Sequence, residues 1–285
     1  MSILKQQRVD SLFAKDGKAV YVPVDHGIGG IKKGLEDPVK VIEKLVEYGA
    51  DGTLLQLGMA KQTMDIFNSA ENPPAKIIAL DYRHYWKIPG HNEGVLSCFQ
   101  SSTVEQAMQY GCSAVKVMIP YGGDEKVTID HVKILTNVIR EADRLDVPVM
   151  VEPMPGGKCP PEYAKDHDVI ANASRIAIEL GADVLKIPYS GDKERFTELV
   201  QVSRIPVTVL GGSPKDIKTV LEAAKDITEC GAKAVVFGRN VWGHHDMKGV
   251  INALKDIIHD GAEVSKTVEK YNLSGSAVTE HNYTI

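Results

Sequence analysis

A helical pattern of apolar and polar residues ends at a glycine in four places, and a short apolar run follows each glycine. The glycines are Gly49, Gly111, Gly181 and Gly231, and the runs are 52–55, 114–117, 184–187 and 234–237. Glycine is common just beyond the last helical residue, because it adopts a left-handed backbone at low cost. Short apolar runs between helices predict strands that are buried on both faces of a parallel sheet.

Further apolar runs lie between these units, and together they predict eight strands near residues 21, 54, 78, 116, 149, 185, 208 and 235. Amphipathic helices are predicted over 38–48, 130–145, 162–180, 216–229 and 248–259. Alternating strands and helices of this number predict an α/β protein, a single-domain (β/α)8 or TIM barrel. A doubly wound open sheet is the alternative. It is disfavoured because no G-x-G-x-x-G motif follows the first predicted strand.

The barrel is expected to span residues 19–262 and to form the catalytic domain. An N-terminal segment, 1–18, precedes it, and a C-terminal tail, 263–285, follows it. The end of the tail, from Leu273 to Ile285, is polar. We expect it to be a loose arm or a contact between subunits.

Composition and charge narrow the classes of function. The 285 residues carry 33 basic and 38 acidic side chains, a net charge of −5, and no long basic run, so a nucleic-acid partner is not expected. No apolar run approaches the roughly 18 residues of a membrane span, and residues 1–8 lack the apolar core of a secretory signal. The cysteines at 98, 112, 159 and 230 form no C-x-x-C motif, which is typical of thiols in a reducing cytoplasm.

Candidate chemistry lies at the carboxyl ends of the predicted strands, where barrel enzymes build their active sites. The polar or flexible residues at these ends are Asp25, His26, Asp81, Tyr82, Arg83, Lys116, Tyr121, Glu152, Lys186, Tyr189, Gly211, Gly212, Ser213, Gly238, Arg239 and Asn240.

Lys186 is unusual because it interrupts the apolar run 184–187. A lysine amine that is desolvated or placed near another cation has a lowered pKa and is suited to Schiff-base chemistry. Lys116 lies five residues after Gly111, just as Lys186 lies five residues after Gly181, so both ammonium groups are expected in one layer of the barrel. Lys116 would then lower the pKa of Lys186 or bind an anionic substrate group. The alternatives are structural: a salt bridge for Lys186, and for Lys116 a solvent-exposed position or a pair with Glu152.

A phosphate-binding site is predicted from Gly211, Gly212 and Ser213 after one strand and Gly238 and Arg239 after the next. Barrel enzymes frequently hold phosphate at this place, with backbone N–H groups and a cation. Asp25, beside His26, either supplies an acid–base carboxylate or caps the following turn. The histidines at 84, 91, 244 and 245 lack the spacing of a zinc site, so no metal is expected.

Four motifs in this order resemble the archaeal-type class I fructose-bisphosphate aldolases, over roughly residues 12–260. They are Val24–Gly27, Leu185–Asp192, Leu210–Lys215 and Phe237–Trp242. The same family includes aminodideoxyheptulosonate synthase and an autoinducer-phosphate thiolase. The resemblance implies that Lys186 is the Schiff-base lysine and Asp25 the catalytic aspartate. It also implies that Gly211, Gly212, Gly238 and Arg239 bind phosphate.

Two positions depart from the family. Its aldolases usually carry a catalytic tyrosine at the end of the fifth strand, whereas this segment reads Val151-Glu152-Pro153-Met154 and contains none. Glu152 is the nearest group that can move a proton. Lys116 stands where a small residue is expected.

The leading hypothesis is therefore a metal-independent, cofactor-free class I aldolase that cleaves or forms a phosphorylated ketose through an iminium on Lys186. Lys186, Asp25 and Glu152 are its expected catalytic residues. Gly211, Gly212, Ser213, Gly238, Arg239, His26 and Lys116 are expected to bind the substrate. The alternatives are a transaldolase-like synthase, a thiolase acting on a phosphorylated carbonyl compound, a zinc aldolase, and a non-enzymatic sugar-phosphate sensor. The resemblance also implies a homo-oligomer.

Overall fold

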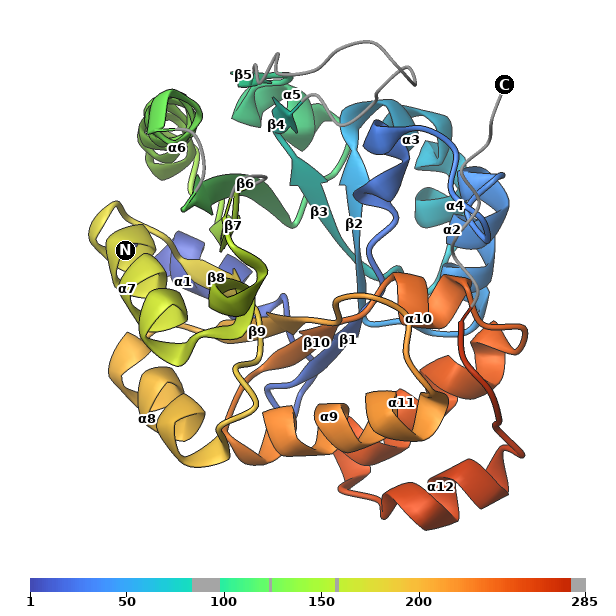
Figure 1. Ribbon diagram of the computed structural model, residues 1–285. Helices are drawn as coiled ribbons and strands as arrows, with labels where there is room; N and C mark the ends of the chain where they lie inside the picture. The colour runs from blue at the N-terminus through green and yellow to red at the C-terminus, as the bar shows by residue number, and fades with distance from the viewer. Residues whose placement is uncertain (84–97, 123–124, 157–158, 278–285) are drawn as a thin grey trace, which may run out of the picture.

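The computed structural model describes residues 1–83, 98–122, 125–156 and 159–277. Within these residues, parallel strands close into a barrel in the order β1-β10-β9-β8-β7-β6-β3-β2, and Figure 1 looks into this ring. The barrel strands are β1 (Ala19–Tyr21), β2 (Gly52–Gln56), β3 (Ala75–Ala79), β6 (Ala114–Tyr121), β7 (Val149–Pro155), β8 (Val184–Ile187), β9 (Val207–Leu210) and β10 (Ala234–Val236). Each coincides with a predicted strand, so the (β/α)8 barrel is confirmed.

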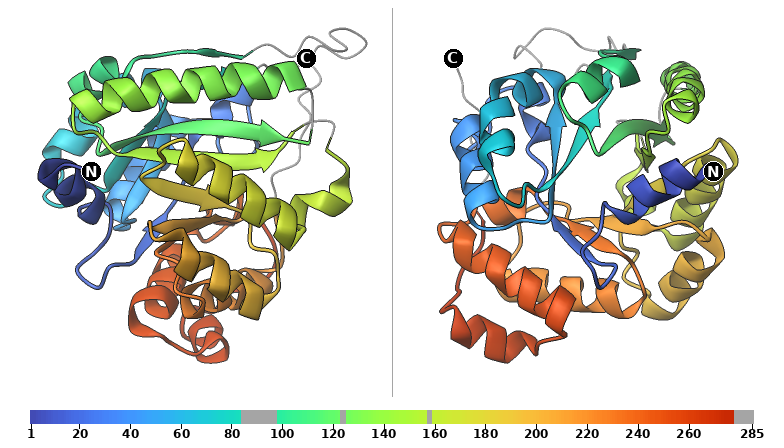
Figure 2. Two further views of the ribbon diagram at one scale, coloured as in Figure 1. Left: turned by 90° about the vertical axis from the view of Figure 1, so that its left-hand side faces the viewer. Right: turned by 180° about the vertical axis from the view of Figure 1, so that it is seen from behind.

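Helices surround the barrel, as Figures 1 and 2 show. They are α1 (Ile3–Asp10), α2 (Pro38–Glu47), α3 (Leu57–Gln62), α4 (Met64–Ser69), α5 (Val104–Gln109), α6 (Glu125–Arg144), α7 (His167–Glu179), α8 (Lys193–Ser203), α9 (Ile217–Glu229), α10 (Arg239–Trp242), α11 (Met247–Asp260) and α12 (Val264–Lys270). Two 3-10 turns, η1 (Asp25–Gly29) and η2 (Pro161–Lys165), lie at strand or helix ends.

Short polar side chains and glycines explain where these helices begin and end. The carboxylates of Asp37, Asp166, Asp192, Asp216 and Asp246 each accept a backbone N–H in the first turn of the helix that follows. Asp166 also explains why the helix expected over 162–180 is divided into η2 and α7. The four glycines that predicted helix ends have φ angles of 71°, 69°, 106° and 88°, as a left-handed end requires.

Two apolar cores hold the barrel together. The larger lies between the strands and the outer helices, and the smaller fills the barrel interior. Val9 and Leu12, from and just after α1, belong to the inner core, and Tyr21 donates its hydroxyl proton to the carbonyl oxygen of Leu12 at 2.6 Å. The N-terminal segment therefore packs against the base of the barrel, the end at which the strands begin (Figure 2, right).

The remaining elements add to the barrel without entering it. Strands β4 (Asp81–Arg83) and β5 (Cys98–Gln100) form an antiparallel pair that the apolar pattern did not predict. In the predicted tail, α12 packs on α9 and α11, Leu273 is buried, and Ser276 forms a β-bridge with Asp216. The last part of that tail, 278–285, lies outside the described residues. None of the described helices combines the length and apolar character needed to cross a bilayer.

Candidate active site

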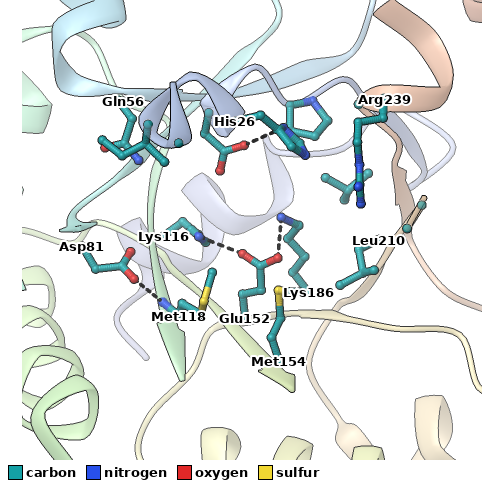
Figure 3. A pocket seen from close by; sticks show the side chains of 18 of the residues that line it. His26, Gln56, Asp81, Lys116, Met118, Glu152, Met154, Lys186, Leu210 and Arg239 are labelled. Atoms are coloured by element: carbon teal, nitrogen blue, oxygen red, sulfur yellow. Dashed lines mark hydrogen bonds and ion pairs between the residues drawn. The ribbon is translucent and has the colours of Figure 1, made fainter. Parts of the chain in front are cut away.

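Three charged side chains from neighbouring strands meet inside the mouth of the barrel, the end at which the strands finish. Glu152 of β7 lies between Lys116 of β6 and Lys186 of β8 (Figure 3). Its Oε2 is 2.8 Å from the Nζ of Lys116, and its Oε1 is 2.7 Å from the Nζ of Lys186. All three side chains are at least nine-tenths buried. The two lysines therefore come together as predicted, and the salt bridges that stood as structural alternatives, from Lys116 to Glu152 and for Lys186, are both present.

The charges of this cluster do not cancel, because two ammonium groups share one carboxylate. Burial raises the pKa of Glu152, but Lys116 and Lys186 outweigh that effect and lower it to about 2. Glu152 is thus ionised at neutral pH, and it offsets the cost of burying the two cations. The remaining positive charge makes this part of the mouth favourable for an anion.

Asp25 and His26 reach the mouth from η1, directly after β1. The Oδ1 of Asp25 is 3.4 Å from the Nδ1 of His26, and the edge of the His26 ring packs on Trp242 at 5.6 Å. Burial lowers the pKa of His26, with Lys186 and Arg239 acting in the same direction and Asp25 against them. The imidazole is therefore neutral near pH 7 and can donate or accept a hydrogen bond.

The loop after β9 carries the predicted phosphate-binding glycines. Gly211 admits no side chain, since a Cβ there would lie 2.7 Å from the ring of Phe237, whereas Gly212 has a φ of 71° and open space beside it. The side chain of Asn240 fixes this loop by accepting from the backbone N–H of Lys215 at 2.9 Å and donating to the carbonyl of Ser213 at 3.3 Å. The helix predicted over 216–229 begins at Ile217, after this loop.

The loop after β10 brings a cation to the same place. Gly238 is packed so closely that a Cβ would lie 2.7 Å from the carbonyl oxygen of Pro23, so only glycine is accommodated here. Arg239 follows it at the start of α10 and is half-buried. Burial lowers the pKa of its guanidinium from a very high value, and the group stays charged.

A cavity of about 310 Å³ joins these groups. It is lined by Pro23, Asp25, His26, Ile28, Gly29, Lys32, Gln56, Asp81, Lys116, Met118, Glu152, Met154, Lys186, Leu210, Gly211, Gly212, Val236, Gly238 and Arg239. Of the residues expected to be catalytic or to bind substrate, all except Ser213 line it, whereas the other strand-end candidates Tyr82, Arg83, Tyr121, Tyr189 and Asn240 do not. A cavity of this size, with a few polar groups among apolar walls, is suited to a small molecule.

Sequence reasoning gave no role to several of these lining residues. Asp81 was visible as a polar residue at a strand end, and Gln56 ends β2 in the same way. Met118, Met154 and Lys32 carry no motif, and only the folded chain shows that they face the cavity. The structure places Glu152 in the middle of β7 and Met154 near its end, the segment in which the resemblance had implied a tyrosine.

The described residues contain no group of three histidine, cysteine, aspartate or glutamate side chains that could hold a metal ion. His244 and His245 stack on each other at 4.3 Å, and the Nε2 of His244 lies 3.2 Å from the carbonyl oxygen of Ser274. His84 and His91 lie outside the described residues.

A closed (β/α)8 barrel whose ionisable cavity lies at the carboxyl ends of its strands has the architecture of a barrel enzyme. The chain belongs to the DeoC/LacD family of aldolases, whose family model matches residues 19–244. The protein is therefore an aldolase-type lyase, and the resemblance seen in its motifs is confirmed.

Relatives of this chain come from several archaea. An uncharacterized aldolase of Saccharolobus solfataricus is 33% identical and covers 92% of this chain and 97% of its own. A class 1 fructose-bisphosphate aldolase of Thermoproteus tenax is 31% identical, with 90% and 95% covered. A 2-amino-3,7-dideoxy-D-threo-hept-6-ulosonate synthase of Halobacterium salinarum is 30% identical, with 90% and 93% covered.

A solved structure of an archaeal fructose-1,6-bisphosphate aldolase is similar to this chain, with a TM-score of 0.75 and 28% identity. The match covers 90% of this chain and 99% of that one. In that structure, the catalytic lysine is covalently bound to the carbinolamine intermediate of the substrate.

Proposed function

We propose that the protein is a class I aldolase that forms a Schiff base between Lys186 and the carbonyl of a phosphorylated ketose. The observation that carries this proposal is the buried group of Lys116, Glu152 and Lys186, which opens onto a cavity bounded by two glycine-containing loops. The similarity to an aldolase whose catalytic lysine is bound to a carbinolamine supports it.

In this reaction the ammonium group of Lys186 first loses a proton to solvent, and the resulting neutral amine attacks the ketone carbon. The carbonyl oxygen leaves as water after protonation, and an iminium remains. The iminium draws electrons from the carbon–carbon bond that breaks, while a hydroxyl on the departing part loses its proton and becomes the aldehyde. The enamine left on Lys186 is then protonated on carbon and hydrolysed, which returns the free amine. The iminium supplies the electron sink, so this route requires no metal.

Two carboxylates at the mouth are candidates for accepting the hydroxyl proton. Glu152 contacts Lys186 directly, but a pKa of about 2 makes it a weak base while both ammonium groups hold it. Formation of the iminium leaves the Lys186 nitrogen with one N–H in place of three. Its hydrogen bonding to Glu152 is then weaker, and Glu152 becomes a stronger base. Asp25 lines the same cavity and is the second candidate.

The substrate phosphate would bind between the two glycine-containing loops. Gly211 and Gly212 on one side and Gly238 on the other bring the backbone close to the cavity, and Arg239 supplies the cation. His26 and Lys116 would add a hydrogen bond and a second positive charge. Ser213 does not line the cavity, so a role for it would require movement of the loop.

A synthase or thiolase that acts on a phosphorylated carbonyl compound is the second candidate function. It is favoured by the segment of β7 in which Glu152 and Met154 stand in place of the expected tyrosine, and by the related heptulosonate synthase. A requirement for coenzyme A would identify the thiolase. Inhibition by chelators would instead point to a zinc aldolase. We also expect a cytoplasmic homo-oligomer.

Borohydride trapping tests the proposal directly. The protein is incubated with a panel of ketose phosphates, reduced, digested and mapped by mass spectrometry. We expect the adduct on Lys186. Lys76 is the internal control, because it is also buried but donates to the carbonyl oxygen of Tyr110 at 2.8 Å and does not line the cavity. An adduct on Lys116 would overturn the assignment of Lys186, and failure to trap any carbonyl compound would favour the non-enzymatic sensor.

A further inference from the structure

Asp81 is a buried carboxylate with an oxygen that no described residue satisfies. Its side chain is only 4% exposed, and it lines the cavity. The Oδ2 atom accepts the backbone N–H of Met118 at 3.2 Å, whereas Oδ1 is buried and has no hydrogen-bond partner among the described residues. A buried polar atom without a partner is costly, and native proteins contain few of them.

The neighbours of Asp81 occupy its Oδ2 and leave its Oδ1 available to a ligand in the cavity. The partners of its carboxylate gather on Oδ2, where His131 of α6 places its Nδ1 at 3.6 Å in addition to the N–H of Met118. Gln56 comes from the neighbouring strand, because it pairs in register with Ala79, two residues before Asp81. Its half-buried side chain also lines the cavity and supplies an amide donor and acceptor.

Asp81 and the glycine-containing loops lie on different sides of the reactive group. Strand β3, which Asp81 follows, stands across the ring from β9, which Gly211 follows. Figure 3 shows Asp81 and Gln56 on one side of the Lys116–Glu152–Lys186 group and Leu210 and Arg239 on the other. A ketose whose phosphate binds at Arg239 and whose ketone reaches Lys186 would therefore extend its remaining carbons toward Asp81.

We propose that Asp81, with Gln56 beside it, is the specificity-determining subsite for the part of the ketose that leaves as the aldehyde, and that it selects hydroxyl groups there and rejects a second phosphate. This inference rests on the proposed function for the position of the phosphate and the ketone. A hydroxyl donates to the unpartnered oxygen, whereas a phosphate in the same place would meet a buried negative charge. The preferred substrate is then a ketose monophosphate with an unphosphorylated end. Lys32 also lines the cavity, and its positive charge would favour the opposite result.

Binding calorimetry with fructose 1-phosphate and fructose 1,6-bisphosphate tests the inference without requiring turnover. We expect the protein to bind the monophosphate at least about tenfold more tightly. In D81N this ratio should fall to about threefold or less, because asparagine keeps an oxygen for the N–H of Met118 but removes the charge. D16N removes a carboxylate at the base of the barrel and should leave the ratio unchanged. Melting curves of both variants confirm that the fold is retained.

Equal or tighter binding of the bisphosphate, or an unchanged ratio in D81N, would overturn the inference. Borohydride trapping on the same samples separates it from the proposed function. If an adduct forms on Lys186 but the two ligands bind equally well, only the Asp81 inference is overturned. If the monophosphate binds more tightly but no adduct forms, only the Schiff-base proposal is overturned. If neither fructose phosphate binds, the Asp81 inference fails, and trapping with the panel of ketose phosphates decides the Schiff base separately.

Discussion

The mouth and the base of the barrel both bury charged side chains, but they partner these side chains differently. At the base, Lys5 lies between Asp183 at 2.6 Å and Asp143 at 2.7 Å, and Asp183 also accepts the backbone N–H of Val149 at 2.8 Å. There, carboxylates outnumber the cation, and the group closes the barrel under α1. At the mouth, Lys116 and Lys186 share Glu152, and the group opens onto a cavity.

Two aspartates, one at the mouth and one at the base, differ in the same way. Asp81 and Asp183 are both buried, and both accept a backbone N–H from a neighbouring strand. Asp183 also holds the ammonium group of Lys5, whereas Asp81 keeps one oxygen beside the cavity that has no partner among the described residues. Charges that are fully paired contribute to the fold, and charges that keep bonding capacity toward a cavity are available to a ligand.

The largest expected effect comes from replacing Lys186 at the mouth. In K186A, turnover should fall on the order of a thousandfold or more, because the covalent nucleophile is gone, while Glu152 keeps its bond to Lys116 and the fold is retained. Steady-state kinetics and melting curves check this. The matched variant K5M removes a buried lysine at the base, so it should lower stability and leave the kcat of the folded protein unchanged. Substantial activity in K186A would show that the nucleophile lies elsewhere.

The strands of the barrel and several residues of the site can be predicted from local sequence signals. Apolar runs and helix-ending glycines predict the eight strands. Polar residues that follow an apolar run identify Asp25 and Glu152, and a lysine within such a run identifies Lys186. The remaining features depend on contacts between distant segments. The sequence does not distinguish Lys5 from the other charged residues of α1. Its buried salt bridge exists only because α1 packs against Asp183. The unpartnered oxygen of Asp81 likewise depends on the position of β6, from which Met118 donates.

Glu152 should show the next largest effect. E152Q keeps the shape of the side chain but removes the charge that holds both lysines and one of the two candidate proton acceptors. We expect kcat to fall about a hundredfold, with the imine on Lys186 still detectable by borohydride trapping. Rapid kinetics and trapping on the same sample check the two parts. Normal turnover with a lower melting temperature would make Glu152 a structural bridge, comparable with Asp183, and leave Asp25 as the acceptor.

Arg239 should affect binding more than chemistry. Loss of a charge-assisted contact to phosphate in R239A is worth about 1.5–3 kcal/mol, which corresponds to a KM raised about 10- to 150-fold with a smaller change in kcat. Kinetics with a phosphorylated ketose measure this change. Arg195 is a suitable control, because its guanidinium pairs with Asp168 on the outside of the barrel. An unchanged KM in R239A would place the phosphate away from the loops after β9 and β10.

The smallest expected effect lies at the base, where His259 joins Asp51 and Asp16. Its Nε2 is 2.9 Å from Asp51 and its Nδ1 is 2.9 Å from Asp16, and the bond to Asp51 is the largest cause of a raised pKa, with burial acting against it. A raised folded-state pKa means that the protonated ring stabilises the fold. That contribution is fully present below the ordinary histidine pKa of about 6.5 and is lost as the pH rises through the higher folded value.

Because the group is partly exposed, we expect the free energy of unfolding of the wild type to exceed that of H259Q by only about 1 kcal/mol near pH 5.5. Melting curves from pH 5.5 to 9 should show this advantage shrinking while kcat stays equal in the two proteins. An advantage that grows with pH would mean that His259 is held neutral at the base.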